Sequence, residues 1–291
     1  MNVTTPDGRT LRVHLGGDEN GIPVVAHHGT PGAGTLYEPL SEDARRRGIC
    51  LIGYDRPGYG GSTRHPGRTI GDCVADVRAI AAALGVERIA TWGVSGGGPH
   101  ALACAALAPD LVAASACVAG ITPYFGESFF DGMSDENVHE FRLALEGETA
   151  VREYTSSLGT AMLAGLDELK EGLGSLLAPV DAAALNGPLG TYFGENLRDA
   201  IEGGVDGWVD DDLAFAGDWG FDPARPQAPV LILYGALDAF VPRSHFDWLA
   251  AHVEGAEVRL EPEHGHLSLV DGPLRDAHAW LVEDRSIPPR S

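Results

Sequence analysis

The feature that most constrains this chain is the segment Gly93-Val94-Ser95-Gly96-Gly97, which stands between an apolar β-rich run (89–94) and a helical run (97–108). In a G-x-S-x-G segment at such a junction, a sharp turn lifts the serine hydroxyl clear of the sheet, and the glycines remove side chains that would collide there. The start of the following helix offers free backbone N–H groups and a partial positive charge to a developing oxyanion. This context predicts that Ser95 is a nucleophile.

The same stretch also fits a dinucleotide-binding fingerprint, because residues 96–101 read G-x-G-x-x-A after a strand and before a helix. That fingerprint requires an acidic residue about 20 positions further on, at the end of the next strand. Here that strand ends in Cys117-Val118-Ala119-Gly120, which contains no acid. The dinucleotide interpretation is therefore disfavoured.

The whole chain alternates β-rich and helical runs, a pattern typical of a mostly parallel sheet covered by helices. Between residues 120 and 226 the chain is instead acidic, aromatic and helix-like. We therefore predict an α/β fold with an eight-stranded sheet flanked by helices, whose core comprises residues 1–120 and 226–291, and an inserted helical cap at 121–225. The strands are expected at 2–5, 10–15, 22–26, 49–54, 89–94, 111–118, 230–235 and 257–260, and the core helices at 70–84, 97–108, 245–252 and 269–282.

The 291 residues carry a formal net charge of −22, and this charge is unevenly distributed. Residues 121–225 contain 21 Asp and Glu against 5 Lys and Arg, so −16 of the charge lies there. A phosphate backbone needs a basic surface, so a nucleic-acid partner is excluded. The acidic segment predicts a well-solvated surface or, alternatively, attraction of cationic substrates.

Other sequence features concern location and redox state. No apolar stretch approaches the roughly 18–20 residues that a membrane helix needs. The N-terminus has neither the basic nor the apolar part of a secretory signal. The four cysteines stand singly, which favours reduced core thiols. We expect a cytoplasmic protein without membrane association, and a homodimer is compatible with the sequence.

A serine nucleophile needs a base and an acid that orients the base, and in a serine-elbow fold they follow in the order acid, then histidine. Either His264 or His266 can supply the base, and we favour His266 because it follows Gly265 at the start of the last helix. Asp238 follows the strand 230–235 and precedes His266 by 28 residues, which makes it the expected acid. The alternative acid position, after the preceding strand, holds no carboxylate.

The oxyanion hole is expected to combine two backbone N–H groups, those of Gly96 and Thr30. Thr30 lies in the segment His28-Gly29-Thr30-Pro31-Gly32 after the strand 22–26. Gly29 permits a close backbone approach and Pro31 stiffens the loop. We predict that His28 locks this loop by hydrogen bonding, and that Asp55 and Arg56 have a structural role in a neighbouring turn.

These segments together resemble the α/β-hydrolase superfamily, in the branch with a helical cap inserted after the sixth strand. The resemblance covers about two-thirds of the chain and not the cap. It implies a triad of Ser95, Asp238 and His266, with Thr30 and Gly96 as the oxyanion hole. Haloalkane dehalogenases and epoxide hydrolases of this fold carry aspartate at the elbow, so Ser95 disfavours both. The motifs that carry the resemblance are H-G-T-P-G (28–32), Y-D-R-P-G-Y-G-G-S (54–62), G-V-S-G-G (93–97), G-A-L-D (235–238) and G-H (265–266).

The function expected is hydrolysis of a carboxylic ester of a small to medium, partly apolar substrate through an acyl-enzyme, without a cofactor or a metal ion. An aminopeptidase similar to proline iminopeptidases is an alternative, in which acids of the cap hold a substrate ammonium group. A ligand-binding receptor that retains the triad is another. Aromatic and aliphatic side chains are expected to bind the substrate, namely Phe125, Phe129, Phe240, Val241 and Leu267.

Overall fold

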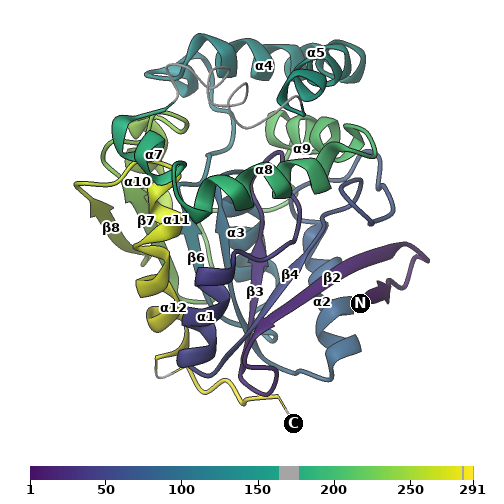
Figure 1. Ribbon diagram of the computed structural model, residues 1–291, viewed down its shortest axis with the longest axis vertical. Helices are drawn as coiled ribbons and strands as arrows, with labels where there is room; N and C mark the ends of the chain where they lie inside the picture. The colour runs from purple at the N-terminus through teal and green to yellow at the C-terminus, as the bar shows by residue number, and fades with distance from the viewer. Residues whose placement is uncertain (164–176, 284, 291) are drawn as a thin grey trace.

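The protein is described by a computed structural model that covers residues 1–163, 177–283 and 285–290 (Figure 1). Its centre is an eight-stranded sheet in the order β1-β2-β4-β3-β5-β6-β7-β8. β1 and β2 pair antiparallel with each other and β2 pairs antiparallel with β4, whereas every pair from β4 to β8 is parallel. The strands are β1 (Asn2–Thr4), β2 (Thr10–Gly17), β3 (Ile22–His27), β4 (Ile49–Tyr54), β5 (Ile89–Val94), β6 (Val112–Val118), β7 (Val230–Gly235) and β8 (Glu257–Glu261).

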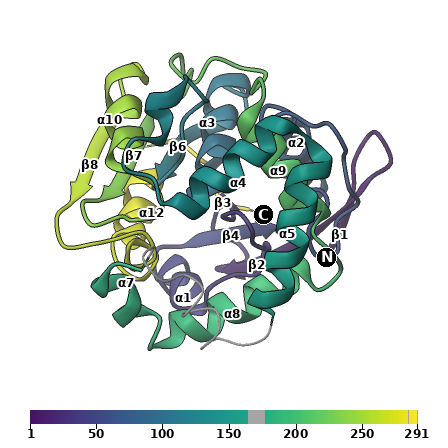
Figure 2. The same ribbon diagram turned by 90° about the horizontal axis from the view of Figure 1, so that it is seen from above.

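Helices cover both faces of the sheet, and a separate apolar core fills each side. Alternate residues of β4 enter different cores, with Leu51 on one side and Ile52 on the other. This alternation follows from the two-residue period of a strand. One face is covered by α1 (Glu38–Arg46) and α12 (Leu274–Val282), and the other by α2 (Cys73–Leu84), α3 (Gly98–Leu107) and α10 (Arg243–His252) (Figures 1 and 2).

The predicted eight-stranded α/β fold is confirmed, and the core helices differ from expectation in several places. The sequence did not predict α1, which lies between β3 and β4 in the chain. The helix expected at 269–282 is divided into α11 (Ser268–Asp271) and α12, because Pro273 lacks a backbone N–H and disfavours helical geometry at Gly272. The helix expected at 97–108 is preceded by a short 3₁₀ turn, η1 (Ser95–Gly97), that contains the elbow serine.

All the described secondary structure between β6 and β7 is helical, and it lies over the carboxyl ends of the parallel strands (Figures 1 and 2). We refer to these elements as the inserted helices. No helix within the described ranges combines the length and apolar character needed to cross a bilayer. The inserted helices are η2 (Glu127–Phe130), α4 (Asp135–Glu146), α5 (Glu148–Met162), α7 (Pro179–Ala184), α8 (Pro188–Ile201) and α9 (Asp206–Ala216).

Candidate active site

Ser95 lies at the sharp turn between β5 and α3, as the sequence predicts. Its φ of +55° is in the left-handed region, which non-glycine residues rarely adopt, and such backbone strain is concentrated at functional sites. The turn is tight, since a Cβ on Gly93 would overlap the backbone of Gly97. The first N–H groups of the following helical turn have no partners within the helix, so they are free to bind a negatively charged oxygen.

Asp238 and His266 form a buried pair beside this turn. The Nδ1 atom of His266 is 2.8 Å from Oδ2 of Asp238, and the two side chains are almost inaccessible to solvent. The other carboxylate oxygen of Asp238 accepts the backbone N–H groups of Phe240 and Val241, each at 2.9 Å. These bonds fix the carboxylate, and the carboxylate in turn fixes the plane of the imidazole ring.

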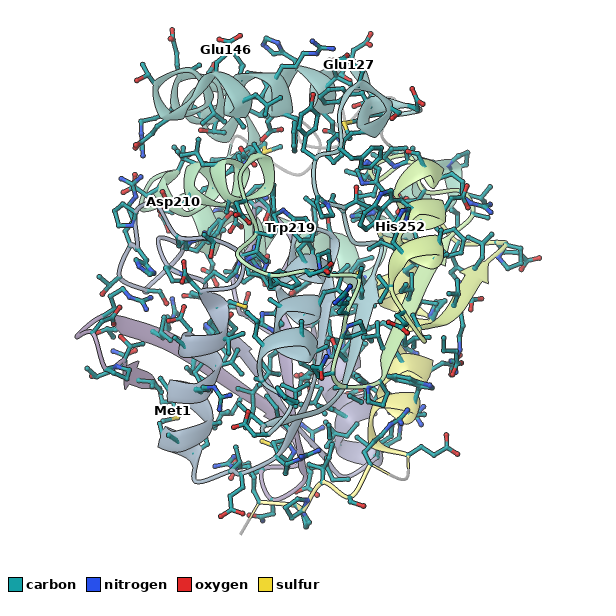
Figure 3. The ribbon with its side chains drawn as sticks, turned by 180° about the vertical axis from the view of Figure 1, so that it is seen from behind. Met1, Glu127, Glu146, Asp210, Trp219 and His252 are labelled. Atoms are coloured by element: carbon teal, nitrogen blue, oxygen red, sulfur yellow. The ribbon has the colours of Figure 1, made fainter. Side chains whose placement is uncertain are left out.

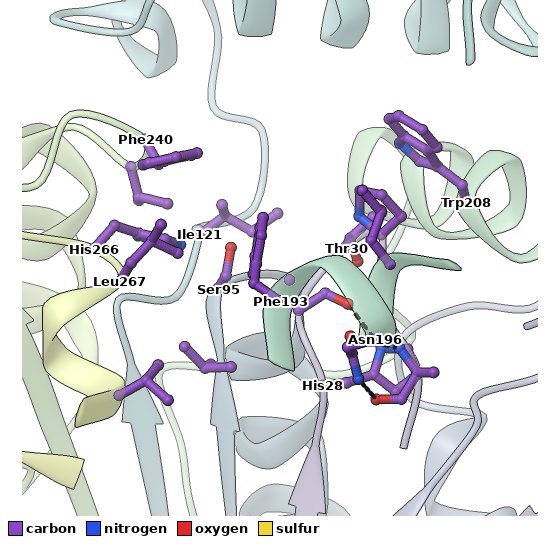
Figure 4. Close-up of a pocket in the computed structure, with 18 of the residues that line it drawn as sticks. His28, Thr30, Ser95, Ile121, Phe193, Asn196, Trp208, Phe240, His266 and Leu267 are labelled. Atoms are coloured by element: carbon purple, nitrogen blue, oxygen red, sulfur yellow. Dashed lines mark hydrogen bonds between the residues drawn. The ribbon is translucent and has the colours of Figure 1, made fainter. Parts of the chain in front are cut away.

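The environment of His266 favours its protonated form. Burial lowers the pKa of this histidine, but the charge and hydrogen bond of Asp238 and the charge of Asp181 raise it above its ordinary value. Because Nδ1 faces Asp238, the other ring nitrogen is left for a second partner, and Figure 4 shows His266 beside Ser95 with a ring nitrogen directed toward the hydroxyl. The alternative base, His264, does not line the cavity that contains Ser95 and His266.

The loop that carries Thr30 is held by Arg56 and His28. The Arg56 guanidinium donates to the carbonyl oxygens of His28 and Gly29 and to Oγ1 of Thr30. Burial and the Arg56 charge lower the pKa of His28 to about 3, so its ring is neutral. One ring nitrogen of His28 then donates to the Gly29 carbonyl (2.7 Å), while the other accepts a hydrogen bond from the backbone N–H of Arg56 (3.1 Å).

Thr30 and Gly96 lie next to each other, as an oxyanion hole requires. A Cβ on Gly96 would come within 2.8 Å of Cβ of Thr30, so only glycine leaves room at this position. Both residues line the same cavity as Ser95. This loop and the elbow therefore border the same cavity.

Asp211 of α9 connects the inserted helices to this loop. Its fully buried carboxylate accepts from Arg56 and Arg68 (2.6 Å each), from Oγ1 of Thr30 (2.6 Å) and from the Tyr59 hydroxyl (2.8 Å). Burial alone would raise the pKa of Asp211, but the two guanidinium groups hold it well below its usual range. Sequence reasoning predicted a structural role for Arg56 and missed Asp211, which stands in a run of three aspartates that reads as solvated surface.

A cavity of about 330 Å³ lies between the strand ends and the inserted helices, with Ser95 and His266 in its wall (Figure 4). Most of the side chains that line it are apolar or aromatic. Core loops and inserted helices both contribute, for example Phe240 and Leu267 from the core loops and Phe193 and Trp208 from α8 and α9. No group of three or more His, Cys, Asp or Glu side chains in the described part of the chain is arranged to hold a metal ion.

Comparison with known proteins decides the family. Residues 22–273 match the family model described as the alpha/beta hydrolase fold. The chain belongs to the α/β-hydrolase family. Its fold and its relatives within that family indicate a hydrolase.

Relatives in the α/β-hydrolase family have different activities. A non-heme chloroperoxidase of Streptomyces lividans is 33% identical over 51% of this chain and 55% of its own length. A proline iminopeptidase of Xanthomonas citri is 36% identical over 36% of this chain and 34% of its own length. The chain thus spans only about half or a third of these relatives. The structure of a thermophilic esterase from Thermogutta terrifontis superposes with a TM-score of 0.69 over 98% of this chain and 99% of that one, at 21% identity, which shows the shared fold alone.

Four of the five side chains expected to bind substrate line the cavity of this α/β-hydrolase. They are Phe129, Phe240, Val241 and Leu267. Phe125 does not line the cavity: its ring stacks on Trp248, and the residue is 38% exposed. The rings of Phe125 and Phe129 contact each other edge to face, with centroids 5.9 Å apart, but only Phe129 reaches the cavity.

Three carboxyl groups of the inserted helices also line the cavity, and two of them, Glu140 and Asp212, have raised pKa values. Glu140 of α4 accepts the indole N–H of Trp208 (2.7 Å), and Asp212 of α9 is buried with one carboxyl oxygen, Oδ2, lacking a hydrogen-bond partner among the described residues. Burial raises the pKa of both groups, and the charge of Glu140 raises that of Asp212 further, well above its usual range. By contrast, Glu127 and Glu146 lie at the outer surface of the same helical layer (Figure 3).

Replacing Asp211 by asparagine is expected to destabilise the protein by about 3–5 kcal/mol, because Arg56 and Arg68 would be left buried without a counter-charge. The matched control is Asp210→Asn on the same helix. Asp210 pairs with the partly exposed Arg64, so this variant should lose only about 1 kcal/mol of unfolding free energy. Urea unfolding measures both. Equal losses in the two variants would contradict the special role of Asp211.

Replacing Asp212 by asparagine is expected to stabilise the protein increasingly as the pH rises. The raised pKa of Asp212 means that its contribution to stability is present at acid pH and is lost as the pH rises toward the folded-state pKa. An asparagine does not ionise, so the variant keeps its stability over that range. The free energy of unfolding of Asp212→Asn minus that of the wild type should therefore grow by more than about 1 kcal/mol between pH 4 and pH 8. Urea unfolding at several pH values tests this, with the exposed Asp218→Asn as control. A difference that does not change with pH would contradict it.

Proposed function

We propose that this protein is a serine hydrolase that cleaves a carboxylic ester of a small to medium, partly apolar substrate. The triad is Ser95, His266 and Asp238, and the oxyanion hole is formed by Thr30 and Gly96. The observation that carries this proposal is the Asp238–His266 pair beside a strained elbow serine in the wall of an apolar cavity. A cavity of this size is at the lower end of the range for small-molecule sites.

In this mechanism, His266 accepts the proton of the Ser95 hydroxyl as its oxygen attacks the ester carbonyl carbon. The negative charge moves to the carbonyl oxygen, where the N–H groups of Thr30 and Gly96 stabilise it. The C–O bond to the leaving alcohol then breaks, and His266 returns the proton to that alcohol. Water, deprotonated by the same histidine, hydrolyses the acyl-enzyme and restores the serine hydroxyl. Asp238 holds the imidazole ring and stabilises its cationic form throughout.

We propose residues 121–225 as a cap over a core formed by 1–120 and 226–291. The support is that the described secondary structure between β6 and β7 is helical and contributes one wall of the cavity. In this arrangement the core supplies the reacting groups and the cap selects the substrate.

The test is a set of initial rates on p-nitrophenyl esters of increasing acyl length, for the wild type and Ser95→Ala. Ester turnover should fall by at least about 10³-fold in the variant, because the nucleophile is lost. His266→Gln should behave similarly, whereas the control His264→Gln should retain activity because His264 does not line the cavity. Equal rates in wild type and Ser95→Ala would overturn the assignment.

A second candidate function is favoured by the Glu140–Asp212 pair. A half-buried and a buried carboxyl group at the wall of a cavity, the buried one with an oxygen lacking a partner in the described chain, suit a substrate that carries an ammonium group. An aminopeptidase acting through the same triad would use such a group. The partial similarity to a proline iminopeptidase is compatible with this alternative.

Paired substrates separate the two functions. If the carboxyl pair holds an ammonium group, Glu140→Gln and Asp212→Asn should lower kcat/KM on proline p-nitroanilide by roughly tenfold, the value of one lost charge-assisted hydrogen bond, and leave neutral esters unchanged. Glu136→Gln is the matched control, since this acid also lines the cavity but is exposed. Turnover of esters alone, unaffected by either substitution, would exclude the aminopeptidase function.

A further inference from the structure

A third buried acid of the inserted helices, Asp181 of α7, contacts the histidine loop. Its carboxylate is fully buried. One oxygen accepts the backbone N–H of His266 and the other accepts that of Ser268, each at 2.8 Å. In the described part of the chain it forms no ion pair with an arginine or a lysine. The contact joins residues that are 85 and 87 positions apart in the sequence.

The fit between this carboxylate and the loop is close. A Cβ on Gly265 would come within 2.7 Å of the carboxyl carbon of Asp181, so glycine is required for the loop to approach it. Gly265 itself donates its N–H to the Ser268 hydroxyl (2.8 Å). The backbone N–H groups of three residues around the histidine are thereby bonded to side chains, two of them to Asp181.

We propose that Asp181 is a positioning residue for His266, which fixes the backbone of the histidine loop and places a second negative charge next to the imidazole ring. This inference rests on the proposed triad. Asp238 orients the ring from its Nδ1 side, whereas Asp181 orients the peptide from which the side chain extends. The inserted helices therefore take part in the arrangement of the general base as well as in the wall of the cavity.

Burial without a cationic partner among the described residues is the physical reason to assign this function to Asp181. A buried carboxylate is costly unless its charge is compensated. Two backbone N–H groups compensate it in part, and the positive charge that His266 acquires during the reaction compensates it further.

The charges around His266 agree with this assignment. Those that raise its pKa belong to Asp238, on the loop after β7, and Asp181, on α7. The acids that line the cavity are different residues on different helices: Glu136 and Glu140 belong to α4, and Asp212 belongs to α9. Removal of the Asp181 charge should therefore lower the pKa of His266 and leave that of a distant histidine unchanged.

The first experiment compares Asp181→Asn with wild type in the pH dependence of kcat/KM on a p-nitrophenyl ester. The acid limb, which reports the free-enzyme pKa of the base, should move to lower pH by roughly half a unit or more. The value of kcat/KM at the plateau should fall about tenfold, because an amide cannot accept both N–H groups. Asp181→Ala should show the same shift of the limb and a greater loss at the plateau.

Asp55→Asn is the matched control for a purely structural effect. Asp55 is also buried and accepts two backbone N–H groups, those of Gly34 and Gly61, but it follows β4, which is separated from the elbow strand by β3. The control should lower the melting temperature without moving the acid limb. An unchanged limb in Asp181→Asn, or an equal shift in both variants, would overturn the proposal.

Two further measurements test the proposal without relying on turnover, and without relying on the correct folding of Asp181→Asn alone. NMR titration of His266 in the Ser95→Ala background, with and without Asp181→Asn, should show the same lowering of its pKa even if the protein is no esterase. Gly265→Ala retains the acid but forces the loop away from it, and should lower kcat with little change in KM. An unshifted titration, or a Gly265→Ala variant with wild-type kcat, would contradict the assignment.

Discussion

The buried ion pair between Arg56 and Asp211 is the interaction on which the arrangement of this protein most depends. Both side chains are withdrawn from water, and a pair of this kind is stable only when its remaining hydrogen-bonding groups are satisfied. Here the Arg56 guanidinium also donates to the carbonyl oxygens of His28 and Gly29. The Asp211 carboxylate also accepts from the Tyr59 hydroxyl and from a second arginine, Arg68. Meeting the needs of one ion pair thus fixes the Thr30 loop, the turn after β4 and the helix α9 relative to one another.

Three buried acids of the inserted helices differ in their partners, and their effects differ accordingly. Asp211 faces two guanidinium groups and is held ionised, whereas Asp212, the next residue, faces another acid and favours the neutral form. Asp181 faces backbone N–H groups beside the histidine. The same residue type therefore stabilises one loop, borders a cavity and contacts the loop of His266, and only the surroundings distinguish these cases.

The sequence predicted what depends on local signals. The eight strands and the α/β class followed from alternation of apolar runs, whereas the order of the strands in the sheet did not. The elbow, the acid and the histidine each stand after a strand, where parallel topology brings them together. The structure brings Ser95, Asp238 and His266 to one cavity, while their catalytic roles stay predictions. The contacts of Asp181 and Asp211 join positions more than 80 residues apart, and an acid in an acidic segment gives no sign of burial. The position of Phe125 has a similar explanation, because packing on Trp248, more than 120 residues away in the sequence, keeps it out of the cavity lining.

The inserted helices occupy the connection between two strands, β6 and β7, that pair directly with each other. The length and sequence of such a connection can change without altering the register of the sheet. The inserted helices can therefore be exchanged between related proteins to change substrate specificity. The buried arginines limit that freedom. A transplanted segment lacking an acid at the position of Asp211 would enclose two uncompensated positive charges, and one lacking an acid at the position of Asp181 would release the histidine loop. Chimeras of this fold must therefore inherit these two carboxylates together with the scaffold that they complete.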